Sequence, residues 1–155
     1  MVAGASLAEQ QALAIASAVA DPEIPVLTIA DLGILRGVSV GPDGRVTARL
    51  SPTYMGCPAV LAIEMAVLAA LHDAGFEAET ERVLSPAWTT DWITPEGRRK
   101  MAEWGIAPPV RNGQPACPQC GSARSETLSE FGSTACKALY RCLDCLEPFD
   151  YFKCL

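Results

Sequence analysis

Two cysteine pairs near the C-terminus constrain this chain most. Cys117-Pro-Gln-Cys120 and Cys142-Leu-Asp-Cys145 are separated by 21 residues, and the segment from Cys117 onward has only 39 residues. A segment that short cannot bury enough apolar surface to fold through its own core, so a metal or cross-links must stabilise it. Each pair presents two thiolates from one tight turn, and the spacing predicts a tetrahedral four-sulfur site of the zinc-ribbon type.

The metal and the remaining thiols leave alternatives open. Zinc in a closed structural site is the ordinary use of this spacing, whereas bound iron or an iron–sulfur cluster also suits four sulfurs. A thioredoxin-like redox pair is disfavoured because no βαβ pattern surrounds the cysteines. Cys136 and Cys154 fall outside both pairs. They are either buried apolar side chains or, with each other or with Cys57, an exposed thiolate site.

A proline-rich stretch divides the chain. Residues 107–116 contain three prolines and a glycine and indicate a linker between a domain of residues 1–106 and a zinc-ribbon module of residues 117–155. Patterning in the first part predicts helices over 7–20, 58–74 and 95–105, and strands over 34–40, 46–50 and 76–84, with a turn at 41–44. The expected fold class is α+β: a small helix–hairpin–helix–strand domain with an antiparallel or mixed sheet, followed by a small β-rich zinc ribbon.

Charge and composition exclude several classes of function. The formal charge of −6 lies entirely in residues 1–106; it fits a solubility role or a protein partner with a basic face, and not nucleic acid. No segment approaches the ~18 apolar residues of a membrane helix, and the alanine-rich start lacks a basic leader. We therefore expect a cytoplasmic protein with reduced thiols. A single histidine, His72, leaves no material for histidine-rich metal sites.

Cys57 is the second candidate site. It is expected directly before a helix that starts at Pro58, where unpaired amides and the positive end of the helix dipole favour a thiolate. A lone cysteine is more often inert packing. Asp21, Glu23 and Asp31 are carboxylates in loops beside a neighbouring strand and could approach Cys57. The alternative is that these acids only stop a helix and form turns.

Three short segments resemble a known family. Asp21-Pro-Glu-Ile-Pro-Val, Asp31-Leu-Gly-Ile-Leu-Arg36 and Pro52-Thr-Tyr-Met-Gly-Cys-Pro58 are similar to the α+β domain of SufT-type and cytosolic-targeting iron–sulfur assembly proteins, over roughly residues 7–85. In that family, function depends on the cysteine that matches Cys57.

A longer resemblance spans nearly the whole chain. Three segments resemble the PaaD family of aerobic phenylacetate degradation. They are Trp88-Thr-Thr-Asp-Trp-Ile-Thr-Pro-Glu-Gly-Arg-Arg99, Phe131-Gly-Ser-Thr-Ala-Cys-Lys-Ala-Leu-Tyr-Arg-Cys142 and Glu147-Pro-Phe-Asp-Tyr-Phe-Lys-Cys154, over residues 88–99, 131–142 and 147–154. The resemblance implies association with the multicomponent phenylacetyl-CoA epoxidase, which joins a di-iron oxygenase to a reductase with flavin and an iron–sulfur cluster. This chain has no Glu-x-x-His di-iron motif and no nucleotide fingerprint, so we do not expect it to catalyse the epoxidation itself.

We therefore expect an accessory factor that matures or inserts the iron–sulfur cluster of that system. Cys57 would be a transient ligand of iron or a cluster, and the structural zinc ligands would be Cys117, Cys120, Cys142 and Cys145. One alternative is a non-catalytic structural subunit of the epoxidase, bound through the tryptophan-containing segment 85–94 and the ribbon. Another is a small electron-transfer protein with a redox-active iron site. The expected partners are the epoxidase and reductase subunits, and a homodimer is left open.

Overall fold

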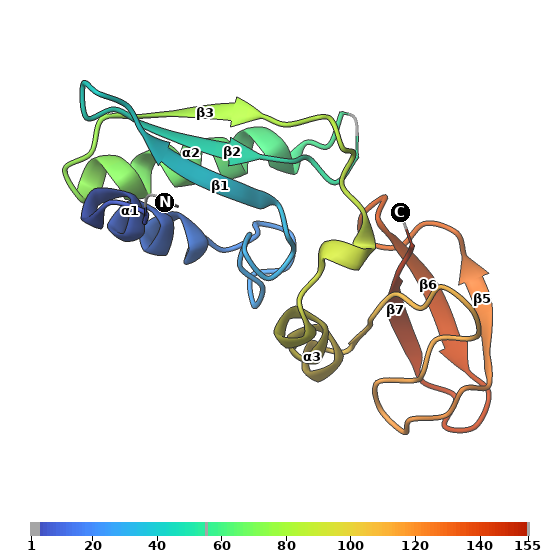
Figure 1. The fold of residues 1–155 in the computed structure, drawn as a ribbon. Coiled ribbons are helices and arrows are strands. Elements are labelled where there is room, and N and C mark those ends of the chain that lie inside the picture. The colour runs from blue at the N-terminus through green and yellow to red at the C-terminus, as the bar shows by residue number, and fades with distance from the viewer. Residues whose placement is uncertain (1–3, 55, 155) are drawn as a thin grey trace. The chain divides into compact units, whose positions relative to one another are not determined.

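The computed structural model describes residues 4–54 and 56–154 and divides into two compact units, Met1–Trp88 and Thr89–Leu155 (Figure 1). The N-terminal unit contains, in chain order, α1 (Leu7–Ser17), β1 (Leu35–Val40), β2 (Val46–Leu50), α2 (Ala59–Asp73) and β3 (Ala78–Arg82). The C-terminal unit contains the short helix η1 (Thr90–Trp92), α3 (Pro95–Trp104), β4 (Ile106–Ala107), β5 (Ser125–Ser129), β6 (Lys137–Cys142) and β7 (Pro148–Phe152).

The N-terminal unit is a mixed sheet with helices on one face. The strand order is β1-β2-β3, with β1 and β2 antiparallel and β2 and β3 parallel. Val46, Ala48 and Leu50 of β2 are buried because alternate residues of a strand point to the same face, and α1 and α2 cover that face (Figure 1). The predicted α+β class is thus confirmed, and of the two predicted sheet types, antiparallel or mixed, the sheet is mixed.

Local signals set the helix ends. Ser6 and Glu9 form a capping box at the start of α1, in which the Glu9 amide donates to Ser6 Oγ at 3.1 Å. The helix ends at Ser17, earlier than predicted, because the chain turns and the Ile29 amide donates to the carbonyl of Val19. The following segment, residues 18–34, has no helix or strand among its described elements, yet it supplies buried Leu27 and Ile29 to the core.

The C-terminal unit joins α3 to the ribbon. Thr94 caps α3 and Gly105, with a φ of 90°, ends it, as the sequence predicted. Directly afterwards β4 pairs in parallel with β7, so the sheet order is β4-β7-β6-β5. The predicted linker of residues 107–116 therefore begins inside a strand, and the compact units divide earlier than residue 106, after Trp88. The domain boundaries drawn from the sequence stay a prediction.

The ribbon core contains two of the paired cysteines. Cys117 and Cys142 are buried together with Ala107, Phe149 and Tyr151, and Tyr140 packs against this group. The ring of Tyr140 stacks on Phe149 with centroids 5.9 Å apart and meets Tyr151 edge-on at 5.2 Å. The final strand, β7, therefore packs its aromatic side chains onto the ribbon.

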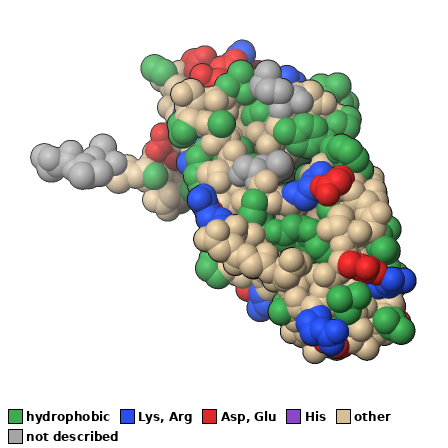
Figure 2. All heavy atoms as spheres, turned by 90° about the vertical axis from the view of Figure 1, so that its right-hand side faces the viewer, with side chains coloured by type: hydrophobic (Ala, Val, Ile, Leu, Met, Phe, Trp, Pro, Cys, Tyr) green, Lys and Arg blue, Asp and Glu red, His purple; other side chains and the backbone are tan. Residues whose placement is uncertain are grey.

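Charge differs between the two units. Residues 1–88 contain ten acidic and four basic side chains, whereas residues 89–155 contain eight of each, so the formal charge of −6 belongs to the N-terminal unit. Several basic side chains visible in Figure 2 lie beside acidic ones. Ion pairs within the C-terminal unit join Arg111 to Asp91, Arg124 to Asp144 and Arg141 to Glu126. Across the described residues, no helix combines the length and apolarity that a membrane crossing requires.

Candidate metal centre and thiol pocket

The two predicted cysteine pairs converge on one point. The Sγ atoms of Cys117, Cys120, Cys142 and Cys145 all lie within 4.8 Å of one another. Cys117 Sγ is 3.7 Å from Cys145 Sγ, and Cys120 Sγ is 3.5 Å from Cys142 Sγ. A tetrahedral metal with bonds to sulfur of about 2.3 Å places its ligand sulfurs about 3.8 Å apart. The four thiols therefore fit a single tetrahedral ion, and the donor set suits zinc or iron.

Each pair forms a knuckle whose amides point at sulfur. The Gln119 amide donates to Cys117 Sγ at 3.4 Å, and the Cys145 amide donates to Cys142 Sγ at 3.5 Å. The hydrogen bond from the Cys145 amide is the main cause that lowers the pKa of Cys142 to about 6. The backbone thus prepares Cys142 to bind metal as a thiolate.

An acidic side chain ties the two knuckles together. The Asp144 carboxylate accepts hydrogen bonds from Ser122 Oγ and from the guanidinium of Arg124, both of which follow the first knuckle. The Leu143 amide also donates to the Arg124 carbonyl at 2.9 Å. This contact was not predicted from the sequence. The sequence features that could have indicated it are Asp144 between the second pair of cysteines, and Ser122 and Arg124 just after the first pair.

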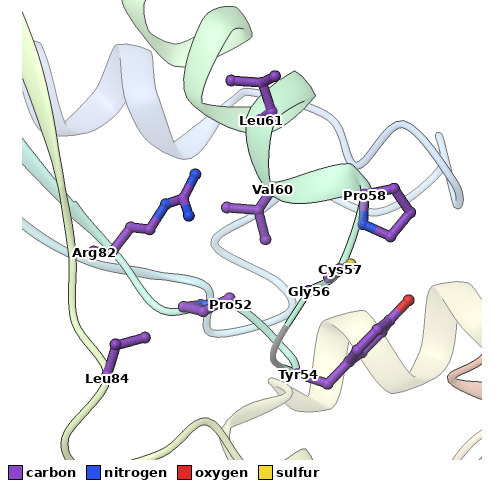
Figure 3. Close-up of a pocket in the computed structure, with 9 residues that line it drawn as sticks. All are labelled: Pro52, Tyr54, Gly56, Cys57, Pro58, Val60, Leu61, Arg82 and Leu84. Carbon is purple, nitrogen blue, oxygen red and sulfur yellow. The ribbon is translucent and has the colours of Figure 1, made fainter.

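Cys57 lies in the other unit, at a shallow hollow. It is half-buried, its amide donates to the Tyr54 carbonyl at 3.3 Å, and Thr53 Oγ1 lies 4.0 Å from its sulfur. Pro58 is the cap residue and Ala59 the first residue of α2, one residue later than predicted. The hollow of about 290 Å³ is lined by Pro52, Tyr54 and residues 56–58 of the loop, by the first turn of α2, and by Arg82 and Leu84 at and just after the end of β3 (Figure 3).

Arg82 is the one charged side chain that lines this hollow among the described residues. It reaches from β3 to α2, where Nε donates to Glu64 Oε1 at 2.6 Å and Nη2 donates to Glu64 Oε2 at 3.0 Å (Figure 3 shows Arg82). The side-chain hydrogen bond from Arg82 is the main reason that the pKa of Glu64 lies below its usual value. Arg82 was not predicted as a site residue. The sequence feature that could have indicated it is a basic residue directly after three alternating glutamates in the predicted strand.

The candidate carboxylates build the loop before β1. Asp21 Oδ1 accepts from the amides of Glu23 and Ile24, each at 2.8 Å. Asp31 Oδ2 accepts from the Thr28 amide at 3.0 Å, and Thr28 Oγ1 accepts from the Asp31 amide at 3.1 Å. These are the turn contacts that the sequence analysis gave as the alternative. None of Asp21, Glu23 and Asp31 is among the described residues that line the hollow at Cys57.

The two leftover thiols take no part in the four-sulfur group. Cys136 is buried, and its sulfur lies 2.9 Å from Thr134 Oγ1. Cys154 is exposed, and its thiol donates to the Val110 carbonyl at 3.3 Å. The Tyr151 hydroxyl, which donates to the same carbonyl, lies 4.0 Å from the Cys154 sulfur. Cys154 thus contacts the segment that precedes the ribbon, whereas Cys136 contacts Thr134.

Family models match the regions that contain the two candidate sites. Residues 109–153 match the family described as "PaaD zinc beta ribbon domain", and residues 9–83 match "Iron-sulfur cluster assembly protein". An Escherichia coli (strain K12) protein whose name describes it as a subunit of 1,2-phenylacetyl-CoA epoxidase is 49% identical over 150 residues, which cover 92% of this chain and 90% of that protein. The chain belongs to the PaaD family.

Other relatives match only part of this PaaD-family chain. A Porphyromonas gingivalis (strain ATCC BAA-308 / W83) protein named "Fe-S protein maturation auxiliary factor" is 32% identical over 85 residues, covering 52% of this chain and 78% of that protein. The solved structure of a "Domain of Unknown Function DUF59" from Bacillus anthracis has a TM-score of 0.56 at 24% identity, covering 61% of this chain and 91% of that one. A "Conserved Hypothetical Protein" from Thermotoga maritima gives 0.51 at 22% identity, covering 64% and 98%. These structures share the fold.

Proposed function

We propose that this PaaD-family chain is an accessory factor that matures or inserts the iron–sulfur cluster of a phenylacetyl-CoA epoxidase system. The observation that carries the proposal is the separation of two kinds of thiol. Four cysteines form a closed group in one unit, while Cys57 stands half-buried at an apolar hollow in the other. The names of two relatives, an epoxidase subunit and an iron–sulfur maturation factor, support the assignment.

The two sites have different chemical roles in this proposal. A four-thiolate set leaves no open coordination position, which is the property of a structural zinc site. That zinc would hold the ribbon together through Cys117, Cys120, Cys142 and Cys145. Cys57 is the one cysteine among the described residues that line its hollow. A single thiolate leaves the other positions of a bound iron or cluster to ligands from a client protein, so the cargo can pass on by ligand exchange.

The test measures cluster loading in cells. The epoxidase reductase is produced together with this chain as wild type, as Cys57→Ser or as Cys154→Ser, and its iron and acid-labile sulfide are determined. Cys154→Ser is the matched control because Cys154 is also accessible but lies in the other unit. We expect Cys57→Ser to reduce cluster occupancy several-fold and the control to leave it unchanged. Full cluster occupancy with Cys57→Ser would refute the proposal.

A non-catalytic structural subunit is the second candidate. It is favoured by the 49% identity, over almost the whole chain, to a protein named as a subunit. It requires co-purification with the epoxidase at fixed stoichiometry and no response to Cys57→Ser. The electron-transfer alternative requires iron in the four-sulfur site. Metal analysis and an absorption spectrum decide that point, since a colourless protein with zinc as its metal cannot carry electrons there.

A further inference from the structure

Two adjoining hollows form one apolar groove on the N-terminal unit. The hollow at Cys57 and a second one of about 170 Å³ share Pro52, Tyr54 and Leu84 in their walls. The second hollow extends to Trp88, whose Nε1 donates to the Leu32 carbonyl at 2.8 Å and is thereby fixed in the unit. We call the surface formed by Pro52, Tyr54, Leu61, Leu84 and Trp88 around Cys57 the thiol groove.

Large apolar side chains are exposed along the thiol groove. Leu61 and Leu84 have 61% and 54% of their surface accessible, and they approach the hollow from α2 and from the segment after β3 (Figure 3). Met65, 63% exposed, lies one turn further along α2 on the same helix face as Leu61. Exposed apolar side chains gathered at a concave surface mark a site for another protein.

The charge around the groove selects the kind of partner. Arg82 in its wall is neutralised by the two hydrogen bonds to Glu64. Of the exposed glutamates on β3 and just before it, Glu77 and Glu79 each pair with Arg45 at 3.7 Å. Glu81 is also exposed, and residues 1–88 have a net charge of −6 and contain no lysine. A second copy of this chain would bring the same net negative charge to the contact. A partner with basic side chains around an apolar segment would instead be attracted.

We propose that the thiol groove docks an apolar segment of the client protein that is flanked by lysine or arginine side chains. The inference rests on the proposed function, because docking there places the client beside Cys57. The apolar segment supplies the buried area, and its basic flanks are attracted by the net negative charge of residues 1–88. In this proposal the apolar side chains of the thiol groove bind the client, and the neighbouring Cys57 transfers the iron or cluster.

The experiment measures binding without transfer. Titration calorimetry follows the association of the purified, cluster-free epoxidase reductase with wild-type chain and with Leu61→Asp, Leu84→Asp and Leu128→Asp. Leu128 is the matched control, an exposed leucine on β5 of the other unit. We expect the two groove variants to bind at least 10-fold more weakly and the control to bind within twofold of wild type. Glu81→Lys, which removes no apolar contact, should also weaken binding, most strongly at low salt.

Each outcome bears on one proposal. Unchanged binding by both groove variants, or no binding by the wild type, overturns the docking proposal. Circular dichroism checks that each variant is folded, and Met65→Asp replaces any that is not. A wild-type dimer in light scattering that Leu84→Asp dissociates would show a second copy as the occupant, and it too overturns the proposal. If Cys57→Ser loads clusters fully while the groove variants still lose binding, the proposed function fails and the docking surface stands.

Discussion

Leu146 occupies in the second knuckle the place that Gly121 occupies in the first, and both residues have a left-handed backbone. Their φ angles are 66° and 78°. The equivalence extends to the backbone, because the amide of Cys117 donates to the Ser122 carbonyl at 2.8 Å and that of Cys142 to the Glu147 carbonyl at 2.9 Å. The two knuckles therefore have the same backbone turn. The first has glycine at the left-handed position, which suits it, and the second has leucine, which does not.

Replacing Leu146 by glycine should stabilise the metal-bound protein. The left-handed conformation costs a residue with a side chain about 1–2 kcal/mol, and glycine removes this cost. The greater conformational freedom of glycine in the unfolded chain cancels about 0.5–1 kcal/mol of the stability gained. Leu146 is 66% exposed, so little packing is lost. We expect a net gain of about 0.5–1 kcal/mol in the free energy of unfolding of the C-terminal unit, measured by urea denaturation.

Gly121→Ala is the reciprocal control. No atom lies within 4 Å of a Cβ added at Gly121, so its cost reports the backbone conformation alone. It should destabilise the unit by about 1 kcal/mol. If Leu146→Gly lowers the stability instead, Leu146 makes contacts that outweigh its backbone strain.

Metal removal should unfold the C-terminal unit and spare the other. Cys117 and Cys142 are part of the ribbon core, so loss of the ion leaves thiols in the core without their partner. After treatment with a chelator, amides of β6 and β7 should lose protection from hydrogen exchange, whereas those of β1 and β2 keep it. Cys142→Ser should behave like the chelated protein. Equal loss of protection in both units would show that they fold as one.

The pair of Glu64 and Arg82 should make the N-terminal unit sensitive to acid. Arg82 lowers the pKa of Glu64 in the folded state below its ordinary value of 4.5. As the pH falls, the unfolded chain therefore takes up this proton first. The contribution of the pair is complete above about pH 5 and is lost as the pH falls through the lowered folded value.

The comparison of wild type with Glu64→Gln tests this. The variant should be slightly less stable in urea at pH 7, and the difference should be smaller at pH 3. A difference that is the same at both pH values would mean that the carboxylate is not the group responsible.

Trp88→Phe should destabilise the N-terminal unit. The substitution removes the Nε1 donor and leaves the Leu32 carbonyl without that hydrogen bond, at a cost of about 1–3 kcal/mol. Trp104→Phe, at an exposed tryptophan of α3, is the matched control and should be within about 0.5 kcal/mol of wild type. Denaturation curves of the two variants give the comparison, and equal stabilities would contradict the role assigned to Trp88.

The four-cysteine group could be predicted from the sequence because each knuckle is a local structure. Four residues set the turn, and the only long-range requirement is that two such turns meet. The capped helix α3 and the alternating strand β2 were predictable for the same reason. Strand β4 was not, since its two residues are a strand only through their pairing with β7, more than forty residues later.

The site at Cys57 could be predicted only in part. The cysteine before a helix is visible in the sequence, but the hollow also needs Arg82 and Leu84, which the parallel pairing of β2 with β3 brings alongside. The loop of residues 18–34 shows the opposite case. Its acids were weighed both as ligand candidates and as turn formers, and Asp21 and Asp31 accept hydrogen bonds from backbone amides of the loop, the turn role.

Each knuckle contributes one buried thiol, Cys117 or Cys142, and one exposed thiol, Cys120 or Cys145. An oxidant in solution therefore meets the outer sulfurs first. Once these are oxidised, the inner pair alone cannot retain the ion, and the aromatic core around Tyr151 loses the cross-link on which it is built. With an ion bound by these four thiols, the folding of the C-terminal unit would depend on the redox state of its surroundings, whereas β1, β2 and β3 of the N-terminal unit contain no cysteine.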